Sequence, residues 1–356
     1  MRTSRFVITL ALLPLLAALG CVSGAPSPTP AAPASPATDP TPTESVSGSI
    51  TVYSGRSQEL VGELIEQFKA DTGITVNVRY GDTAELAVLL TEEGANTPAD
   101  VFFAQDAGAL GAVAQAEMLA SLPADLLERV PAALRSPADL WVGISGRARV
   151  LAYDSRELDA AELPESVDEL TAPEWRGRIG WAPTNGSFQA FVTAYRRLRG
   201  DDAARDWLEG MLANEPRRYE GNTPIVQAIA DAEIDVGLVN HYYALRQRAE
   251  QGAGFPVENH FFPGTDAGAL INVAGVGILS ASDDQAAARR FIEYLLSEHA
   301  QQYFANETYE YPLAEGVPLS PDIPPLTSLQ PPTMDLSRLD DLEGTLKLLQ
   351  DVGVLP

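Results

Sequence analysis

The sequence predicts an α/β fold in which strands alternate with helices and the strands of each sheet run mostly parallel. Two observations favour this class. Short β-rich runs such as Ser49–Tyr53 are followed by stretches whose apolar residues recur with the 3.6-residue period of a helix. The 356 residues are also enough for two domains with substantial cores. Ligands of such folds bind at the carboxyl ends of the strands.

The first helix is expected between Ser57, a suitable N-cap, and Gly73, a suitable stop. The apolar residues on one of its faces are Leu60, Val61, Leu64, Ile65 and Phe68. The elements expected next are strand Ile74–Tyr80, helix Asp82–Gly94, strand Asp100–Phe103 and helix Ala107–Glu117.

The second part of the chain continues the alternation. The expected strands are Leu140–Ile144, Arg149–Tyr153, Asp235–Val239 and a stretch around Leu270–Leu279. The expected helices are Ser187–Leu198, Asp202–Leu212, His241–Gln251 and Asp283–Asn306.

The charge balance excludes one class of partner. Asp and Glu number 49 against 24 Lys and Arg, which gives a formal net charge of -25. An acidic surface without a basic patch repels phosphate backbones, so no nucleic-acid partner is expected.

The N-terminus has the pattern of a secretory signal peptide. Arg2 and Arg5 precede an apolar stretch, Phe6–Leu19, that is too short to span a bilayer. Residues 1–20 are therefore expected to be removed. The small residues before Cys21 resemble a bacterial lipobox, which implies lipidation of that cysteine; an ordinary cleavage site is the alternative.

The stretch after the signal is rich in Pro, Ala, Ser and Thr, and residues 21–48 are expected to form an extended tether. A lipid and a tether predict a protein held at the outer face of a membrane, at the cell surface or in the periplasm. The membrane contact is expected to be the lipid alone.

Motifs of common enzymes are missing from the sequence. It contains no HExxH, GxSxG, Walker or GxGxxG pattern. We therefore expect a binding protein rather than an enzyme.

Two tyrosines, Tyr242 and Tyr243, stand at a strand-to-helix junction. In the first turn of a helix adjacent side chains lie only ~100° apart, so two phenols can converge on one point. Phenolate is a hard oxygen donor. Because a free tyrosine has a pKa near ~10, both phenols ionise at neutral pH only beside a strongly charged cation. Fe³⁺ is the obvious candidate, and apolar contact between the rings is the alternative.

A second pattern, Thr184-Asn185-Gly186-Ser187, leads into an amphipathic helix. Free N–H groups at a helix start, flanked by small polar residues, form an anion site. The alternative is a helix cap without a ligand.

From Ile50 onward the chain resembles the ferric-iron-binding proteins of bacterial ABC importers. The matching stretches, in the family's order, are Ile50–Gly55, Thr97–Phe102, Ser145–Val150, Trp175–Gly180 and Asn240–Tyr243. The resemblance implies a two-lobed type II periplasmic-binding-protein fold. Each lobe would be a mostly parallel sheet flanked by helices, with the ligand cleft between the lobes. Lobe 1 would comprise residues 49–146 and 272–322, and lobe 2 residues 147–271 and 323–356.

The resemblance also implies a ligand set. Tyr242 and Tyr243 would be tyrosinate ligands of Fe(III), and the loop 184–187 would hold a synergistic anion, phosphate or carbonate. Further residues implied at the anion are Asn222 and Asn240, which match polar residues flanking it, and Arg147 and Arg149, which lie where the chain crosses between lobes. Each arginine would pair either with the anion or with a structural partner.

The chain departs from this family at two positions. The best-known members have a histidine at Ser57 and a glutamate at Gln105 as further ligands. Gln105 still offers a carbonyl oxygen. Asp106 is a candidate replacement ligand, and its alternative role is to cap the helix Ala107–Glu117.

The implied partners are an ABC permease and its ATPase, and the protein is expected to be a monomer. One alternative keeps the fold with a polyamine, thiamine or an oxyanion as cargo. Its aromatic walls would come from Trp141, Trp175, Trp181 and Trp207. Another alternative is a surface sensor lipoprotein.

Overall fold

The computed structural model describes residues 47–314 and 316–356. The predicted signal peptide, Cys21 and residues 21–46 of the predicted tether lie outside the described residues, so the lipidation of Cys21 stays a prediction. Within the two described ranges, no helix has the length and apolar character needed to cross a membrane.

The strands form one sheet in the order β2-β1-β3-β9-β4-β7-β5-β6, and β8 and β10 pair with β4 beside this path. Their bounds are β1 Ser49–Ser54, β2 Thr75–Tyr80, β3 Val101–Ala104, β4 Val142–Asp154, β5 Ile179–Trp181, β6 Arg217–Arg218, β7 Val236–Asn240, β8 Val257–His260, β9 Ile271–Ile278 and β10 Tyr311–Pro312.

The sheet has two halves that share β4. In the first half β1 pairs in parallel with β2 and β3, and in the second half β5 pairs in parallel with β6 and β7. Strands β4 and β9 are antiparallel to all their partners. The expected parallel pairing thus holds within each half, and the strands that connect the halves make the sheet mixed.

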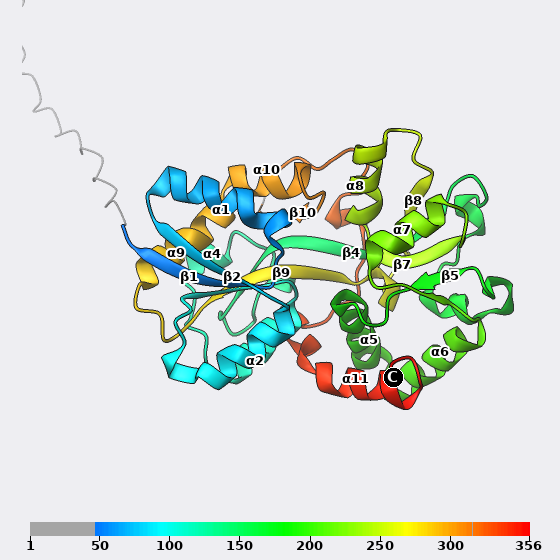
Figure 1. The fold of residues 1–356 in the computed structure, drawn as a ribbon, viewed down its shortest axis with the longest axis horizontal. Helices are drawn as coiled ribbons and strands as arrows, with labels where there is room; N and C mark the ends of the chain where they lie inside the picture. Colours follow the sequence, from blue (N-terminus) through cyan, green and yellow to red (C-terminus); the bar gives the residue numbers. More distant parts are fainter. Residues whose placement is uncertain (1–46, 315) are drawn as a thin grey trace, which may run out of the picture. The chain divides into compact units, whose positions relative to one another are not determined.

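Helices cover both faces of each half. Figure 1 shows α1, α9 and α10 on one face of the first half and α2 on the other, with α7 and α8 opposite α5 and α6 in the second half. The bounds are α1 Gln58–Thr72, α2 Thr83–Glu93, α3 Ala107–Gln115, α4 Ala124–Leu127, α5 Gly186–Arg199, α6 Asp201–Ala213, α7 Asn222–Ala230, α8 Tyr242–Gln251, α9 Gln285–Leu295, α10 Glu298–Asn306 and α11 Leu342–Asp351.

The local signals account for the first helix. Its residues Val61, Leu64, Ile65 and Phe68 are buried, as their spacing predicts. Gly73 ends it in the left-handed conformation, with φ of 73°, which is strained for a residue with a side chain.

Two predicted elements differ from the structure. The strands expected at Leu140–Ile144 and Arg149–Tyr153 are one strand, β4, whose 13 residues are all buried because it runs through both halves of the sheet. The helix expected at Asp283–Asn306 is two helices. The break lies at Ser297, whose side chain accepts a hydrogen bond from the Ala300 N–H and caps α10.

Two hydrophobic clusters form the cores. The first includes Ile50, Phe68 and Phe102, and the second is rich in aromatic residues such as Phe191 and Trp207. The described body forms one compact unit that contains both clusters.

The C-terminal segment, residues 335–345, passes from the first half to the second. A short 3₁₀ turn at Leu336–Asp340 packs on α3, and α11 packs on α5. Gly108 and Gly111 of α3 permit this approach, because a Cβ atom at either would clash with a backbone carbonyl of the segment.

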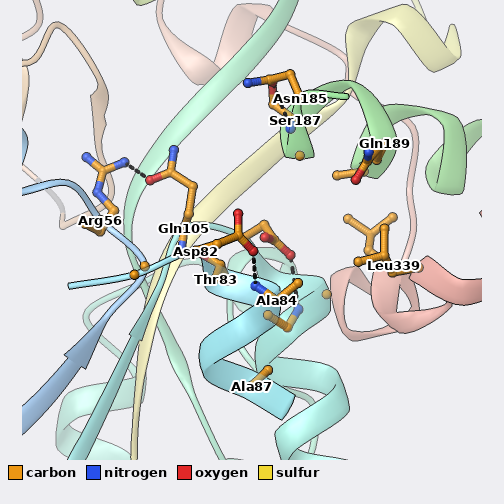
Figure 2. A pocket seen from close by; sticks show the side chains of 18 of the residues that line it. Arg56, Asp82, Thr83, Ala84, Ala87, Gln105, Asn185, Ser187, Gln189 and Leu339 are labelled. Atoms are coloured by element: carbon orange, nitrogen blue, oxygen red, sulfur yellow. Dashed lines mark hydrogen bonds between the residues drawn. The ribbon is translucent and has the colours of Figure 1, made fainter. Parts of the chain in front are cut away.

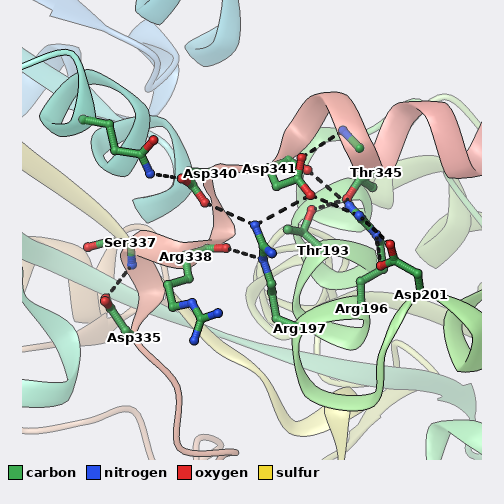
Figure 3. Close-up of polar contacts among 12 residues, drawn as sticks. Thr193, Arg196, Arg197, Asp201, Asp335, Ser337, Arg338, Asp340, Asp341 and Thr345 are labelled. Carbon is green, nitrogen blue, oxygen red and sulfur yellow. Dashed lines mark hydrogen bonds and ion pairs between the residues drawn. The ribbon is translucent and has the colours of Figure 1, made fainter.

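Side-chain contacts also connect the C-terminal segment to helices of both halves. Asp340 contacts Gln115 of α3. It also lies 3.7 Å from Arg197 of α5, and Figure 3 shows these two side chains reaching toward each other. Lobe 2 was expected to include residues 323–356. Within this stretch the 3₁₀ turn Leu336–Asp340 packs on α3 and also contacts α5, and α11 packs on α5. The division into lobes stays a prediction.

Candidate functional site

A cavity of about 910 Å³ lies between the two halves of the sheet. It is reached by the loops that leave the carboxyl ends of β1 and β3 in the first half and of β5 and β7 in the second. Figure 2 shows Arg56 and Gln105 on one side of this cleft and Asn185 and Ser187 on the other. The sequence-predicted residues that line it are Ser57, Gln105, Asp106, Arg147, Thr184, Asn185, Gly186, Ser187, Asn240, Tyr242 and Tyr243.

The rings of the two tyrosines stack on each other, a contact that the alternative of apolar packing also predicts. Helix α8 begins at Tyr242, two residues after the end of β7. The ring centroids of Tyr242 and Tyr243 are 4.4 Å apart, and the rings are tilted by 28°. Tyr242 is 1% exposed.

Burial is the main cause that raises the pKa of Tyr243 well above 10, and the neighbouring Tyr242 raises it further. The charges of Arg147 and Arg56 act in the opposite direction. Tyr243 is therefore a neutral phenol at pH 7 in the ligand-free protein, and a cation must displace its proton to bind the oxygen.

The predicted anion loop forms a connected network. Asn185 caps α5, and its side-chain oxygen accepts hydrogen bonds from the Ser187 N–H at 3.1 Å and from Asn222 Nδ2 at 3.2 Å. The oxygen of Asn222 accepts one from the Asn240 N–H at 3.2 Å. Contacts between α5, α7 and β7 thus bring together residues that are far apart in the chain.

Arg149 supports this network from behind. It is 3% exposed, donates to the Leu238 carbonyl at 2.8 Å and to Ser187 Oγ at 3.4 Å, and lies over the ring of Phe191. Burial lowers the pKa of Arg149 to about 9, against the effect of the two tyrosines. It does not line the cleft, so the geometry favours the structural alternative for Arg149.

Arg147 differs from Arg149 in its hydrogen-bond partners. It is 1% exposed and lines the cleft, and its Nη1 and Nη2 atoms have no hydrogen-bond partner among the described residues. Burial lowers the pKa of Arg147, and Tyr242 is the largest of the charges that oppose the effect. Unpaired buried donors are costly, and an anion would satisfy them.

Ser57 and Asp106 line the first half of the cleft. Ser57 is exposed at the N-cap of α1 and makes no side-chain capping bond. Asp106 caps α3 by accepting from the Ala109 N–H at 3.0 Å. Burial raises the pKa of Asp106, and Arg147 lowers it. The cap predicted for Asp106 is confirmed.

Sequence reasoning missed a buried ion pair beside the cleft. Arg56, 1% exposed, pairs with Glu310, and its Nη1 atom also donates to Gln105 Oε1 at 2.8 Å. Arg56 follows the carboxyl end of β1, where ligand contacts are expected, so its position was a usable signal. No local pattern identifies Glu310, which lies 254 residues away.

Other candidate groups lie elsewhere. All four tryptophans are at most 5% exposed, and none lines the cleft, so they do not form the aromatic walls considered for an organic cation. In the described part of the chain, no group of three His, Cys, Asp or Glu side chains is placed to hold a metal ion.

The fold and its cleft define a two-lobed solute-binding protein of the type II periplasmic class. The chain belongs to the bacterial extracellular solute-binding protein family, whose profile matches residues 96–338. Its similar relatives include ferric-iron-binding proteins. One is the Fe(3+)-binding periplasmic protein of Serratia marcescens, 32% identical over 86% of this chain and 90% of the relative.

The solved structures to which this chain is similar include proteins with bound iron. Iron-bound HitA from Pseudomonas aeruginosa is 34% identical, with a TM-score of 0.80 over 86% of this chain and 99% of that one. A Trichodesmium protein in complex with iron and citrate ligands is 32% identical, with a TM-score of 0.75 over the same shares.

Proposed function

We propose that this protein is the extracytoplasmic substrate-binding component of an iron importer and that it captures ferric iron in the cleft. The observation that carries the proposal is the stacked pair of buried Tyr242 and half-buried Tyr243, which both line the cleft and whose oxygens are hard donors at the start of α8. The ferric-iron-binding relatives named above support it.

In this proposal both tyrosines bind Fe³⁺ as phenolates, each losing a proton. A synergistic anion, phosphate or carbonate, sits at the N-terminus of α5, where Asn185 and Ser187 order the loop and the helix dipole favours negative charge. Arg147 supplies a further anion contact. Asp106 and Ser57 are the candidate ligands from the first half of the cleft.

Capture requires no bond cleavage in the cargo. The bound metal and the bound anion each touch both halves of the sheet. They therefore stabilise the arrangement in which the two halves are close together. The halves act as two lobes, with lobe 1 from residues 49–146 and 272–340 and lobe 2 from 147–271 and α11. The closed protein then presents one surface to an ABC permease and its ATPase. The protein acts as a monomer and is held at the membrane through lipid on Cys21.

A ferric titration of the body, residues 47–356, tests the proposal. With phosphate or bicarbonate present, iron is expected to produce a saturable visible absorption at one equivalent, because phenolate-to-Fe³⁺ charge transfer is coloured. The double variant Tyr242→Phe/Tyr243→Phe should lose the colour. Tyr153→Phe is the matched control, since its hydroxyl contacts Glu258 outside the cleft and the colour should persist.

Absence of colour with either anion would overturn the iron assignment and leave the fold as it is. The same measurement then extends to the alternative cargoes, polyamines and free oxyanions, by calorimetry on the same body.

A further inference from the structure

Helix α8 begins at Tyr242 without a side-chain cap. The N-cap residue is His241, and its side chain makes no capping hydrogen bond to the helix. The first N–H groups of a helix have no partners within it, so an uncapped first turn is the part that frays most easily. Both tyrosines lie in this turn. Contacts from other elements of the fold therefore have to hold it in place.

His241 receives those contacts through three polar groups. Its N–H donates to the Ala148 carbonyl at 3.0 Å, and its ring Nδ1 accepts from the Ala148 N–H at 3.2 Å. Its carbonyl accepts from Nδ2 of Asn259 at 2.7 Å. Ala148 belongs to β4 and Asn259 to β8, and these two strands pair with each other. The residue before the two tyrosines is therefore tied to the sheet by its N–H, its carbonyl and its ring.

The ring of His241 is also fixed by packing. His241 is fully buried, and its ring lies edge-on to that of Tyr242, with 5.8 Å between the ring centroids. The ring of Tyr311 on β10 lies 4.8 Å from it on the same measure. None of His241, Ala148 and Asn259 lines the cleft. They do not touch a cargo there, and any effect they have on it passes through the tyrosines.

We propose that His241 and Asn259 are positioning residues, which hold the phenol oxygens of the two tyrosines where Fe³⁺ binds them. The inference rests on the proposed function and names residues outside the cleft on which its affinity depends. Metal ligands are oriented by groups that do not touch the metal, and the loss of such a group typically lowers metal affinity ~10–100-fold. The alternative, in which these bonds serve only the stability of α8, leaves the geometry of the bound metal unchanged.

Asn259→Leu is the first test. The Oδ1 atom of Asn259 is buried and has no hydrogen-bond partner among the described residues, so the substitution removes a single side-chain hydrogen bond. The body of residues 47–356 is titrated with ferric iron and phosphate, in competition with nitrilotriacetate. Iron affinity is expected to fall about tenfold or more. The visible absorption per bound iron should fall toward that of Tyr243→Phe, because a misplaced phenolate contributes less to the charge-transfer band.

Asn214→Leu is the matched control. Asn214 is a buried asparagine at the end of α6, and its Nδ2 donates to the carbonyls of Leu170 and Ala172 at 2.8 and 2.7 Å. It does not line the cleft. The control variant should lose stability, while its iron affinity and its absorption per bound iron should match those of the original protein.

His241→Leu and His241→Asn test the contribution of the ring acceptor. Leucine removes the acceptor for the Ala148 N–H, whereas an asparagine oxygen can take its place. Iron affinity should fall about tenfold or more in His241→Leu. His241→Asn should recover part of this loss and bring the absorption band back toward its original position.

Unchanged iron affinity and unchanged absorption per bound iron in folded Asn259→Leu and His241→Leu would overturn the positioning role and leave the iron function in place. An equal change in Asn214→Leu would also overturn it, because the effect would then follow from a general loss of stability. Absence of colour in the unmodified protein would instead overturn the iron function itself. Thermal unfolding without ligand checks that each variant is folded, and if His241→Leu does not fold, Asn259→Leu alone decides.

Discussion

Arg56 and Glu310 form a buried ion pair that joins the carboxyl end of β1 to the chain just before β10, across 254 residues. Both side chains are at most 1% exposed. Each charge has lost its hydration and depends on the other. The pair is also the fixed point from which Gln105 is oriented.

Breaking this pair should be costly. Glu310→Ala leaves Arg56 charged and buried, and the free energy of unfolding is expected to fall by ~3–5 kcal/mol. Urea denaturation measures the change. The control is Glu215→Ala, which removes an ion pair to Arg176 whose side chains are more than 60% exposed, and it should change little. Equal effects of the two substitutions would contradict the dependence on burial.

The cap of α5 should combine a stability role with a ligand role. Asn185→Ala removes the acceptor for Ser187 and Asn222 and should cost ~1 kcal/mol of stability. It should also weaken phosphate-dependent iron binding, because the loop at the anion site loses its order.

Asp284→Ala is the matched control for Asn185→Ala. It removes the cap of α9, where Asp284 accepts from the Ala287 N–H at 3.1 Å, and should cost similar stability. Iron affinity at fixed phosphate should not change. If both variants bind iron equally well, the loop has no part in anion binding.

His241 should make the ligand-free protein sensitive to acid. Burial lowers the pKa of His241 from 6.5 to about 4, so between these values the unfolded chain binds a proton that the folded protein does not. Stability therefore falls as the pH drops below ~6.5, by ~2 kcal/mol between pH 7.5 and pH 5.0. Urea denaturation at the two pH values measures this loss.

His241→Asn separates this effect from other titrations. In the original protein, Nδ1 of the His241 ring accepts a hydrogen bond from the Ala148 N–H at 3.2 Å. The side-chain oxygen of asparagine can still accept this hydrogen bond. The variant should lose less stability than the original protein on acidification. An identical loss in both would assign the acid sensitivity to other groups.

Local patterns predicted much of the fold and the centre of the site. Alternating strands and helices, the cap at Asp106 and the convergence of Tyr242 and Tyr243 depend on neighbours within one turn or one strand, so spacing is enough to anticipate them. The continuity of β4 was missed because its small and charged residues around Ser145 and Arg147 look like an interruption until both halves of the sheet cover them.

Contacts between distant segments were beyond prediction from the sequence. Glu310 has no periodicity that points to Arg56, and nothing in the residues around Gln105 shows which end of its amide faces the cleft. The packing of the C-terminal segment on α3 likewise requires the two backbones to come close together. Gly108 and Gly111 make this close contact possible, but they do not show which segment makes it.

The C-terminal helix also bears on the order in which the protein can fold. Leu348, Leu349 and Val354 fill part of the second core, although most of that core comes from residues between Leu151 and Ala269. The first core also takes residues from this end of the chain, among them Leu336 and Leu339. Neither core is therefore complete until the C-terminal segment is available, and a truncation that removes α11 would leave the second core with an open apolar face.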